Sequence, residues 1–303
     1  MPISLPPISR RHWLKNSLAA SLASLTPRAW TAEAVQESWV LFSDTHVAAD
    51  AALVARKACM AENLQRCVNQ VLKLGQKPFG VMVNGDCVYL QGLKEDYETF
   101  GTLINPLREA GVQVHCTLGN HDDRKNFMAA FTSVEDPRPV EGKHVSVLSS
   151  ASVNWVLLDS LDQVNKTPGI LGASQLGWLD RTLKNLPNRP TFIVAHHNPQ
   201  VPVPEGEKHT GLVDSDGMFE VLAKHKKVRA FIYGHTHTWA HTQHEATGIH
   251  LLNLPPVAYV FNEARPNGWV MARVSGDAVE FELHALNPNH EQHRQKIRVP
   301  LAA

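Results

Sequence analysis

The sequence predicts a single α/β domain that spans residues 35–303. From Ser38 onward, short runs of β-branched and apolar residues alternate with helix-like segments, which is the pattern of an α/β architecture. The chain has 303 residues, 43% hydrophobic and 19% charged, so it has a globular composition and enough length for a sizeable core. Most of the predicted strands are followed at once by Asp, Asn or His, which places polar side chains along one edge of a sheet.

The individual elements are predicted from apolar periodicity and from residues that start or stop helices. Strands are expected at 38–43, 79–84, 112–117, 153–158, 191–195 and 229–233. Helices are expected near 51–74, 95–109, 174–186 and 214–225; Gly75 follows the first, and Ser174 opens the third. The β-rich segments 249–254, 268–274 and 278–286 are expected to form a second sheet, and 201–208 a loop.

The N-terminal residues 1–34 have the order of parts found in a signal peptide. Arg10 and Arg11 precede Trp13, Leu14 and Lys15, a mildly apolar run follows at 18–25, and small residues follow at 29–34. The arginine pair resembles a twin-arginine export signal. We therefore expect a periplasmic or extracytoplasmic protein; the alternative is a cytoplasmic protein with an unstructured leader whose arginine pair arose by chance.

The charge balance excludes two classes of partner. The 29 basic residues equal the 29 acidic ones, and without a basic run we expect no binding to a nucleic acid duplex. No stretch of 18 apolar residues occurs, so no stable membrane anchor is expected once the signal is removed. Nothing in the sequence indicates an oligomeric state. The 17 histidines point instead to metal binding or acid–base chemistry.

Five short motifs follow the predicted strands. They are Asp44-Thr45-His46, Asn84-Gly85-Asp86, Gly119-Asn120-His121-Asp122, His196-His197 and Gly234-His235-Thr236-His237. Each motif alone is a common turn sequence. Their ordered occurrence at the ends of strands instead predicts a dense pocket of nitrogen and oxygen donors, with glycines that let the backbone approach it closely.

Such a donor set suits a pair of metal ions. Two divalent ions about 3.5–4 Å apart need a bridging ligand and several terminal ligands, and a pair of this kind activates water and stabilises in-line displacement at phosphorus. A carboxylate can bridge, while imidazole and oxygen donors admit divalent or mixed-valence iron, manganese, zinc or cobalt.

The order D-x-H, G-D, G-N-H-D, H and G-H-x-H resembles that of the calcineurin-like metallophosphoesterases. This resemblance covers residues 38–240 and implies a four-layer αββα sandwich with the two-metal site at the carboxyl ends of the strands, the C-terminal strands completing the second sheet. One metal would be held by Asp44, His46, Asp86 and His237. The other would be held by Asp86, Asn120, His196 and His235, with Asp86 bridging. His121 matches the family's catalytic histidine, which is not a ligand.

The finer pattern resembles the bacterial class III cyclic-nucleotide phosphodiesterase branch. The segments that carry this likeness are residues 119–124, the predicted helix at 95–109 and residues 175–179. The implied function is hydrolysis of a small-molecule phosphodiester, of cyclic-nucleotide or glycerophosphodiester type, by a metal-bridging hydroxide while His121 assists the leaving oxygen. A phosphomonoesterase of nucleotidase or acid phosphatase type, using the same site, and an inert metal-binding protein of the same fold are the alternatives. The chain departs from the branch at Asn198, where a proline is usual.

Several further residues are candidates for the substrate pocket. Asn120, His121, Arg124 and His197 are expected to contact substrate, although Arg124 would equally suit a surface salt bridge. Tyr89, which has the spacing of a metal-binding tyrosine in purple acid phosphatases, is interpreted as a residue near the metals that does not bind them. Tyr259 and Phe261 could line a leaving-group pocket, but packing at a strand edge is the more common role of such residues.

Overall fold

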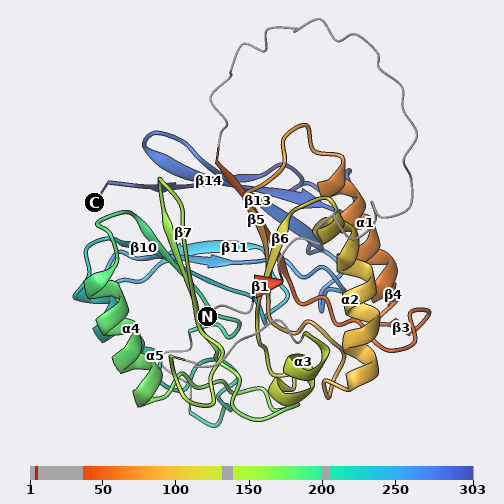
Figure 1. The fold of residues 1–303 in the computed structure, drawn as a ribbon, viewed down its shortest axis with the longest axis horizontal. Coiled ribbons are helices and arrows are strands. Elements are labelled where there is room, and N and C mark those ends of the chain that lie inside the picture. Colours follow the sequence, from red (N-terminus) through yellow and green to blue (C-terminus); the bar gives the residue numbers. More distant parts are fainter. Residues whose placement is uncertain (1–3, 6–36, 132–138, 200–204, 303) are drawn as a thin grey trace, which may run out of the picture.

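Two stacked β-sheets with helices on their outer faces make up the computed structural model, which describes residues 4–5, 37–131, 139–199 and 205–302 (Figure 1). The predicted leader therefore lies outside the described residues except for 4–5, and so does part of the predicted loop at 201–208. Among the described residues, none of the helices is long and apolar enough to cross a membrane.

The first sheet has seven strands in the order β1-β6-β5-β2-β13-β14-β15. Its strands are β1 (Ser4–Leu5), β2 (Ser38–Ser43), β5 (Gly80–Asn84), β6 (Gln113–Thr117), β13 (Gly268–Val274), β14 (Ala278–Ala285) and β15 (Lys296–Pro300). The strands β2, β5 and β6 are parallel, and β13 pairs antiparallel with β2. The carboxyl ends of the three parallel strands therefore lie at one edge of the sheet.

The second sheet has six strands in the order β11-β12-β10-β9-β8-β7. Its strands are β7 (Ser146–Ser149), β8 (Asn154–Leu157), β9 (Thr191–Val194), β10 (Val228–Tyr233), β11 (Ala240–Gln243) and β12 (His250–Asn253). The strands β8, β9, β10 and β12 are parallel. This sheet thus has its own edge of carboxyl ends, and the predicted histidine motifs at 196–197 and 234–237 follow β9 and β10 at that edge.

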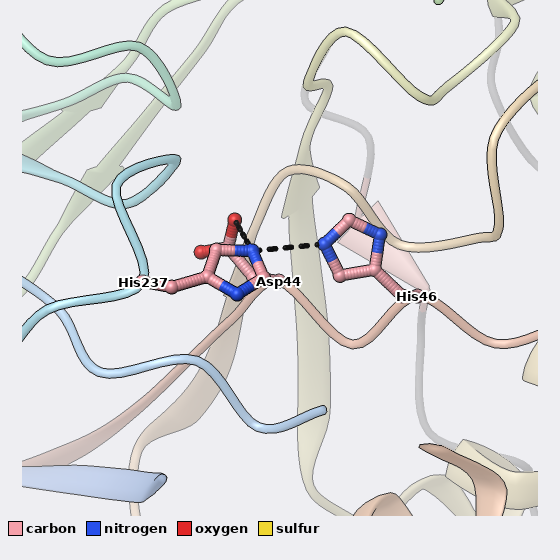
Figure 2. Close-up of side chains that lie close together, drawn as sticks. All are labelled: Asp44, His46 and His237. Atoms are coloured by element: carbon pink, nitrogen blue, oxygen red, sulfur yellow. Dashed lines mark hydrogen bonds and ion pairs between the residues drawn. The ribbon is translucent and has the colours of Figure 1, made fainter. Parts of the chain in front are cut away.

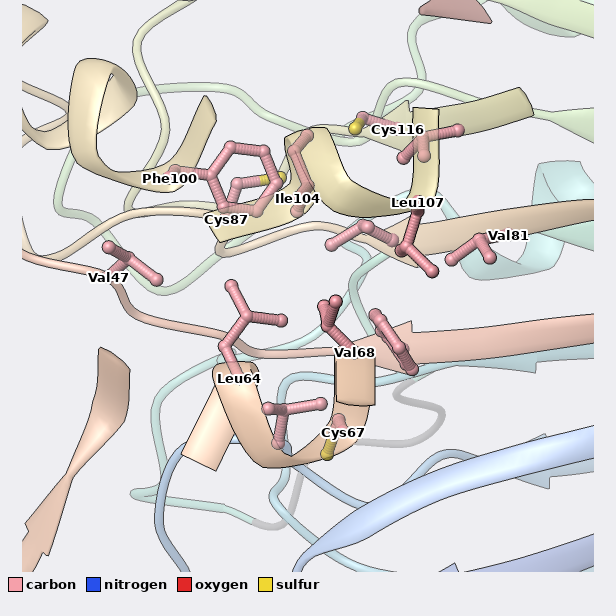
Figure 3. Packing of buried hydrophobic residues seen from close by; sticks show 14 of the residues in the cluster. Val47, Leu64, Cys67, Val68, Val81, Cys87, Phe100, Ile104, Leu107 and Cys116 are labelled. Carbon is pink, nitrogen blue, oxygen red and sulfur yellow. The ribbon is translucent and has the colours of Figure 1, made fainter. Parts of the chain in front are cut away.

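Alternation along β2 explains how the layers are held together. Val40 and Phe42 belong to the core beneath the helices of the first sheet, while Trp39 and Leu41 belong to the core between the sheets. Successive side chains of a strand point to opposite faces, so a strand that is buried on both faces is apolar throughout. Figure 3 shows the first of these cores, which includes Leu64 and Val68 of one helix, Leu107 of another and Val81 of β5.

The helices complete a four-layer αββα sandwich. The first sheet is covered by α1 (Met60–Leu72), α2 (Lys94–Glu109) and α3 (Arg124–Ala130), and the second by α4 (Ala173–Asn185) and α5 (Ser215–Ala223) (Figure 1). The predicted fold class is confirmed, as are the six predicted strands and the last three predicted helices, with bounds that shift by at most two residues. The short helix α3 was not predicted; it begins after Asp123, whose side chain accepts a hydrogen bond from Asn126 N at 2.8 Å.

Two predictions about secondary structure are wrong. Residues 51–59 do not begin the first helix: they form a turn and a hairpin of β3 (Val54–Ala55) and β4 (Ala58–Cys59). The C-terminal strands do not form one separate sheet either. Only β12 joins the second sheet, while β13, β14 and β15 extend the first, because β13 pairs with β2. Side chains of β13 pack both in the core beneath the helices of the first sheet and in the core between the two sheets.

Candidate metal centre

Five loops at the carboxyl ends of parallel strands bring the predicted ligands together. The strands β2, β5 and β6 of the first sheet lead to Asp44 and His46, to Asp86, and to Asn120 with His121; β9 and β10 of the second lead to His196 with His197, and to His235 with His237. Backbone hydrogen bonds tie neighbouring loops, for example His46 N to Asp86 O at 2.9 Å and Gly234 N to His196 O at 2.9 Å. The site therefore spans both sheets.

The backbone is strained at five of the seven predicted ligands. Left-handed φ angles occur at Asp44 (53°), His46 (44°), Asp86 (45°), His235 (68°) and His237 (52°). In L-residues this conformation places Cβ close to the following carbonyl and costs about 1–2 kcal/mol per residue. Such strain persists where the surrounding structure imposes it, and it gathers at functional sites.

Two glycines leave room for the side chains of the site. A Cβ atom on Gly85, which has φ +71°, would lie 2.5 Å from His196 Nδ1. A Cβ atom on Gly119 would collide with Asp86 Oδ1 and with the Asp86 backbone nitrogen. The glycines of the motifs thus permit close approach to the site, as the sequence predicts.

A first group of donors consists of Asp44, His46 and His237, which point toward one another in Figure 2. The Nε2 atoms of His46 and His237 are 3.1 Å apart, and His237 Nε2 is 3.3 Å from Asp44 Oδ1. All three residues are buried. Asp44 is also anchored from outside the group, because its carboxylate accepts hydrogen bonds from His235 N at 3.1 and 3.2 Å.

A second group consists of Asp86, His196 and His235. Asp86 Oδ2 is 3.2 Å from His196 Nε2 and 3.7 Å from His46 Nε2, so this carboxylate lies between the two groups. The side-chain oxygen Oδ1 of Asn120 is buried and has no hydrogen-bond partner among the described residues. An acceptor left unpaired in this way is costly unless something outside the polypeptide binds it.

The geometry of the donors fits metal ions. His196 Nδ1 is 2.9 Å from Asn84 O, and His237 Nδ1 is 2.6 Å from Tyr259 O. A carbonyl can only accept, so each Nδ1 carries a proton, and each Nε2 presents a lone pair to the site once it has no proton of its own. Two ligands bound to one ion at about 2.0–2.2 Å lie about 3–3.5 Å apart. The distances of 3.1, 3.3 and 3.2 Å given above for His46–His237, His237–Asp44 and Asp86–His196 match this spacing.

Burial and neighbouring charges set the protonation of the donors. Burial lowers the pKa of His46 to about 3 and that of His235 to about 4, so both imidazoles are neutral and able to bind metal. Burial would raise the pKa of Asp44, but His237 and His196 lower it to about 2. Burial would lower the pKa of His196, yet Asp86 and Asp44 raise it to about 9, so a bound cation must displace this proton.

His121 lies beside His46 and Asp86, and the three form a third group of potential metal donors. Its backbone nitrogen donates to Asp86 Oδ1 at 2.8 Å, and its ring Nδ1 is 2.9 Å from Leu90 O. Nδ1 therefore carries a proton toward that carbonyl, which fixes the ring and leaves Nε2 outside this bond. The ring lines the cavity described below, as expected of a residue that meets the substrate.

Asp122, whose role the sequence does not reveal, ties two of the loops together. Its Oδ2 accepts hydrogen bonds from Gly119 N at 2.9 Å and Cys87 N at 3.2 Å, and its Oδ1 accepts one from Tyr97 Oη at 3.1 Å. Burial and the charge of Asp86 raise the pKa of Asp122 to about 7. The only signal in the sequence is its place directly after the Asn-His pair.

Two of the expected substrate contacts have partners within the protein. Arg124 forms a bidentate ion pair with the buried Asp159, at 2.7 and 3.0 Å, and does not line the cavity. Its contact with substrate stays a prediction that this geometry does not support. His197 is fully buried and packs against His196 and His235, with Nδ1 2.8 Å from Ser160 Oγ. Ser160 belongs to none of the sequence motifs. The metal-binding roles of the seven predicted ligands also stay predictions, although the structure brings these residues together.

A cavity of about 520 Å³ opens over the donors. Its lining includes Asp86, Asn120 and His235 of the predicted site and, beside them, Tyr89, Arg56, Tyr259 and Phe261. Tyr259 and Phe261 thus line a pocket, which was the less common of the two roles considered for them. Arg56 had no signal in the sequence, since it falls where a helix was predicted.

Comparisons with known proteins agree with this geometry. The family described as calcineurin-like phosphoesterase matches residues 39–239. The chain is 27% identical over 203 residues to "Probable glycerophosphodiester phosphodiesterase GpdQ" of Arcobacter nitrofigilis, which covers 65% of this chain and 71% of that protein. It is 26% identical over 247 residues to the 3′,5′-cyclic adenosine monophosphate phosphodiesterase CpdA of Vibrio vulnificus, covering 80% and 84%.

A solved structure supports the fold. The crystal structure of a dimetal phosphatase from Danio rerio superposes with a TM-score of 0.65 at 15% identity, over 88% of this chain and 99% of that one. The family match covers the motifs from Asp44 to His237, and the structure brings those motifs to one site. This chain therefore belongs to the calcineurin-like phosphoesterase family and is a metal-dependent phosphoester hydrolase.

Proposed function

We propose that the protein hydrolyses small-molecule phosphodiesters at a two-metal centre. The observation that carries the proposal is the pair of donor groups with the carboxylate of Asp86 between them, beside a cavity that Asp86 helps to line. Asp44, His46, Asp86 and His237 would hold one ion, and Asp86, Asn120, His196 and His235 the other. Two bound ions would supply Lewis acidity and an activated water for in-line displacement at phosphorus.

Residues of the chain itself would position the substrate and supply a proton to the leaving oxygen. His121 lines the cavity with its Nδ1–H directed at Leu90 O. In the doubly protonated ring the second proton is on Nε2, and this is the proton that His121 would give to the leaving oxygen, becoming neutral as it does so. Asn120 lines the same cavity and orients the phosphoryl group. The buried imidazole of His197 packs against His196 and His235 and holds their rings in place.

Support for a diester comes from the relatives and from the cavity. The relatives are named for cyclic nucleotide and glycerophosphodiester hydrolysis. A volume of about 520 Å³ accommodates an ester with a substituent on each side of phosphorus. The aromatic faces of Tyr259 and Phe261 suit a planar or apolar leaving group.

Side-by-side rates on two chromogenic esters test the proposal. The purified protein, reconstituted with metal, should hydrolyse bis-p-nitrophenyl phosphate with a kcat/KM at least about tenfold above that for p-nitrophenyl phosphate, a difference of about 1.4 kcal/mol. An Asp44→Asn variant purified in parallel controls for contaminating phosphatase. The reverse preference would identify a phosphomonoesterase, and two bound metals without turnover an inert metal-binding protein.

The metals and the location of the protein are also proposals. Imidazole, carboxylate and amide donors suit iron, manganese, zinc or cobalt, and reconstitution with each ion in turn identifies the active one. The leader supports export by the twin-arginine route, which carries proteins already folded around their metals. Cell fractionation of the full chain beside an Arg10→Lys, Arg11→Lys double variant tests this: export should fail in the variant, and equal export of both would contradict the proposal.

A further inference from the structure

The hairpin of β3 and β4 places a strained two-residue tip beside the cavity. Val54 pairs with Cys59 and Ala55 with Ala58, so Arg56 and Lys57 form the turn. Both have left-handed backbones, with φ of 47° and 66°. A two-residue hairpin turn of this kind is normally built from Asn and Gly, because other residues are strained in it by about 1–2 kcal/mol each. Two long cationic residues at such a position suggest a use for their side chains.

The position of this tip is fixed by packing. Ala55 and Ala58 of the hairpin pack against a small cluster of Met60, Ala258 and Tyr259. At the turn itself, Lys57 forms an ion pair with Glu263 on the exposed surface. The hairpin is thus held against the segment that contributes Tyr259 and Phe261 to the cavity.

Arg56 lies over two aromatic rings without a polar partner. Its guanidinium carbon is 4.9 Å from the ring centre of Phe261 and 5.7 Å from that of Tyr259. Among the described residues, no carboxylate or hydrogen-bond acceptor is paired with this guanidinium. Stacking on aromatic faces orients the plane of the group and leaves its five N–H donors available.

Arg56 and Phe261 also line a second hollow next to the metal cavity. This hollow has a volume of about 450 Å³ and includes Lys57, Arg265 and His290. Its one carboxylate among the described residues, Glu263, is already paired with Lys57. The wall between the two cavities is therefore locally cationic, although the chain as a whole has no net charge.

We propose that Arg56 is a specificity-determining residue that binds a second anionic group on the substrate, at a distance from the scissile phosphorus. The inference rests on the proposed function, because it takes the scissile group to lie over the metal donors. An oriented guanidinium with free donors suits bidentate recognition of a phosphate or carboxylate. The substrate class is therefore a phosphodiester whose leaving group or other substituent carries a further phosphate or carboxylate.

A matched pair of esters tests this. Thymidine 5′-(p-nitrophenyl phosphate) and its 3′-phosphorylated form have the same scissile bond and differ by one remote phosphate. Wild type should prefer the 3′-phosphorylated ester. Arg56→Ala should lower kcat/KM about tenfold on that ester and less than about threefold on the other. Arg56→Lys should retain part of the preference, because lysine keeps the positive charge but lacks the paired N–H donors of the guanidinium. Arg181→Ala, which removes an exposed arginine from α4, is the matched control and should leave both values unchanged.

Two outcomes would overturn the proposal: no preference for the phosphorylated ester in wild type, or an equal loss on both esters in Arg56→Ala. Binding separates this failure from failure of the proposed function. Calorimetry with thymidine 3′,5′-bisphosphate and thymidine 5′-monophosphate requires no turnover. If the metal-loaded protein cleaves neither ester, a loss of affinity in Arg56→Ala confined to the bisphosphate would still support the anion site, and an unchanged affinity would reject it.

Discussion

Asp122 should stabilise the folded protein because its side-chain oxygen accepts two backbone hydrogen bonds, and not because it is charged. It is completely buried, and its Oδ2 is the acceptor for the backbone N–H groups of Gly119 and Cys87, the chain neighbours of Asn120 and Asp86. Replacement by Ala removes that acceptor and leaves two buried N–H groups without a partner. Replacement by Asn keeps an oxygen for both groups and turns an amide toward the Tyr97 hydroxyl.

The expected difference between the two variants follows from the cost of unpaired groups. Each buried N–H without a partner costs about 1–3 kcal/mol, so Asp122→Ala should lower the free energy of unfolding by about 2–6 kcal/mol. Asp122→Asn should stay within about 1 kcal/mol of wild type near pH 6. A neutral group suits this position because burial and Asp86 raise the pKa of Asp122 to about 7, so the wild-type carboxyl is largely protonated there.

Urea unfolding of the chelator-treated proteins at pH 6, followed by tryptophan fluorescence and circular dichroism, measures both values without a contribution from bound metal. Agreement between the two probes checks that the transition is two-state. If Asp122→Ala were as stable as Asp122→Asn, the two backbone hydrogen bonds would not hold the loops, and the role given to Asp122 would be wrong.

Three further predictions concern the metals, the proton and pH. Asp86→Asn should reduce bound metal from two ions per chain to below one and lower kcat/KM at least about 10³-fold, or about 4 kcal/mol; unchanged metal content by mass spectrometry would exclude a bridging role. His121→Ala should keep both metals but lower kcat about 10²–10⁴-fold, and full turnover would remove this histidine from the proton transfer. In metal-free protein, the raised pKa of Asp122 means that the folded state binds this proton more tightly than the unfolded state, whose pKa is near 3.8. The stability of wild type relative to Asp122→Asn should therefore fall as pH rises from about 4 through 7, and a flat difference between pH 4 and 8 would contradict the assignment.

The clustering of the predicted ligands could be anticipated from the sequence because their positions follow from strand topology. Asp44, Asp86 and Asn120 each follow a parallel strand of one sheet, and such strands end at the same edge. The glycines beside them carry their own physical signal, since Gly85 needs a left-handed backbone and space for His196.

What the sequence does not predict depends on contacts between distant segments. Residues 51–59 are rich in alanine and lack the Asn or Gly of a tight turn, so they favour a helix locally, yet packing against Ala258 and Tyr259 makes a hairpin. The partner of Arg124 lies 35 residues away at Asp159 and has no motif around it. The choice of sheet for β13 also depends on pairing with β2, which local periodicity does not encode.

The most direct test of the two-metal account is a titration of the chelator-treated protein with its active metal. The rate on bis-p-nitrophenyl phosphate is measured after each addition, and bound metal is determined on the same samples. The account predicts that the rate reaches its plateau at two bound ions per chain and that Asp86→Asn reaches no plateau over the same range. A plateau at one ion, or two tightly bound ions with no hydrolysis, would contradict it.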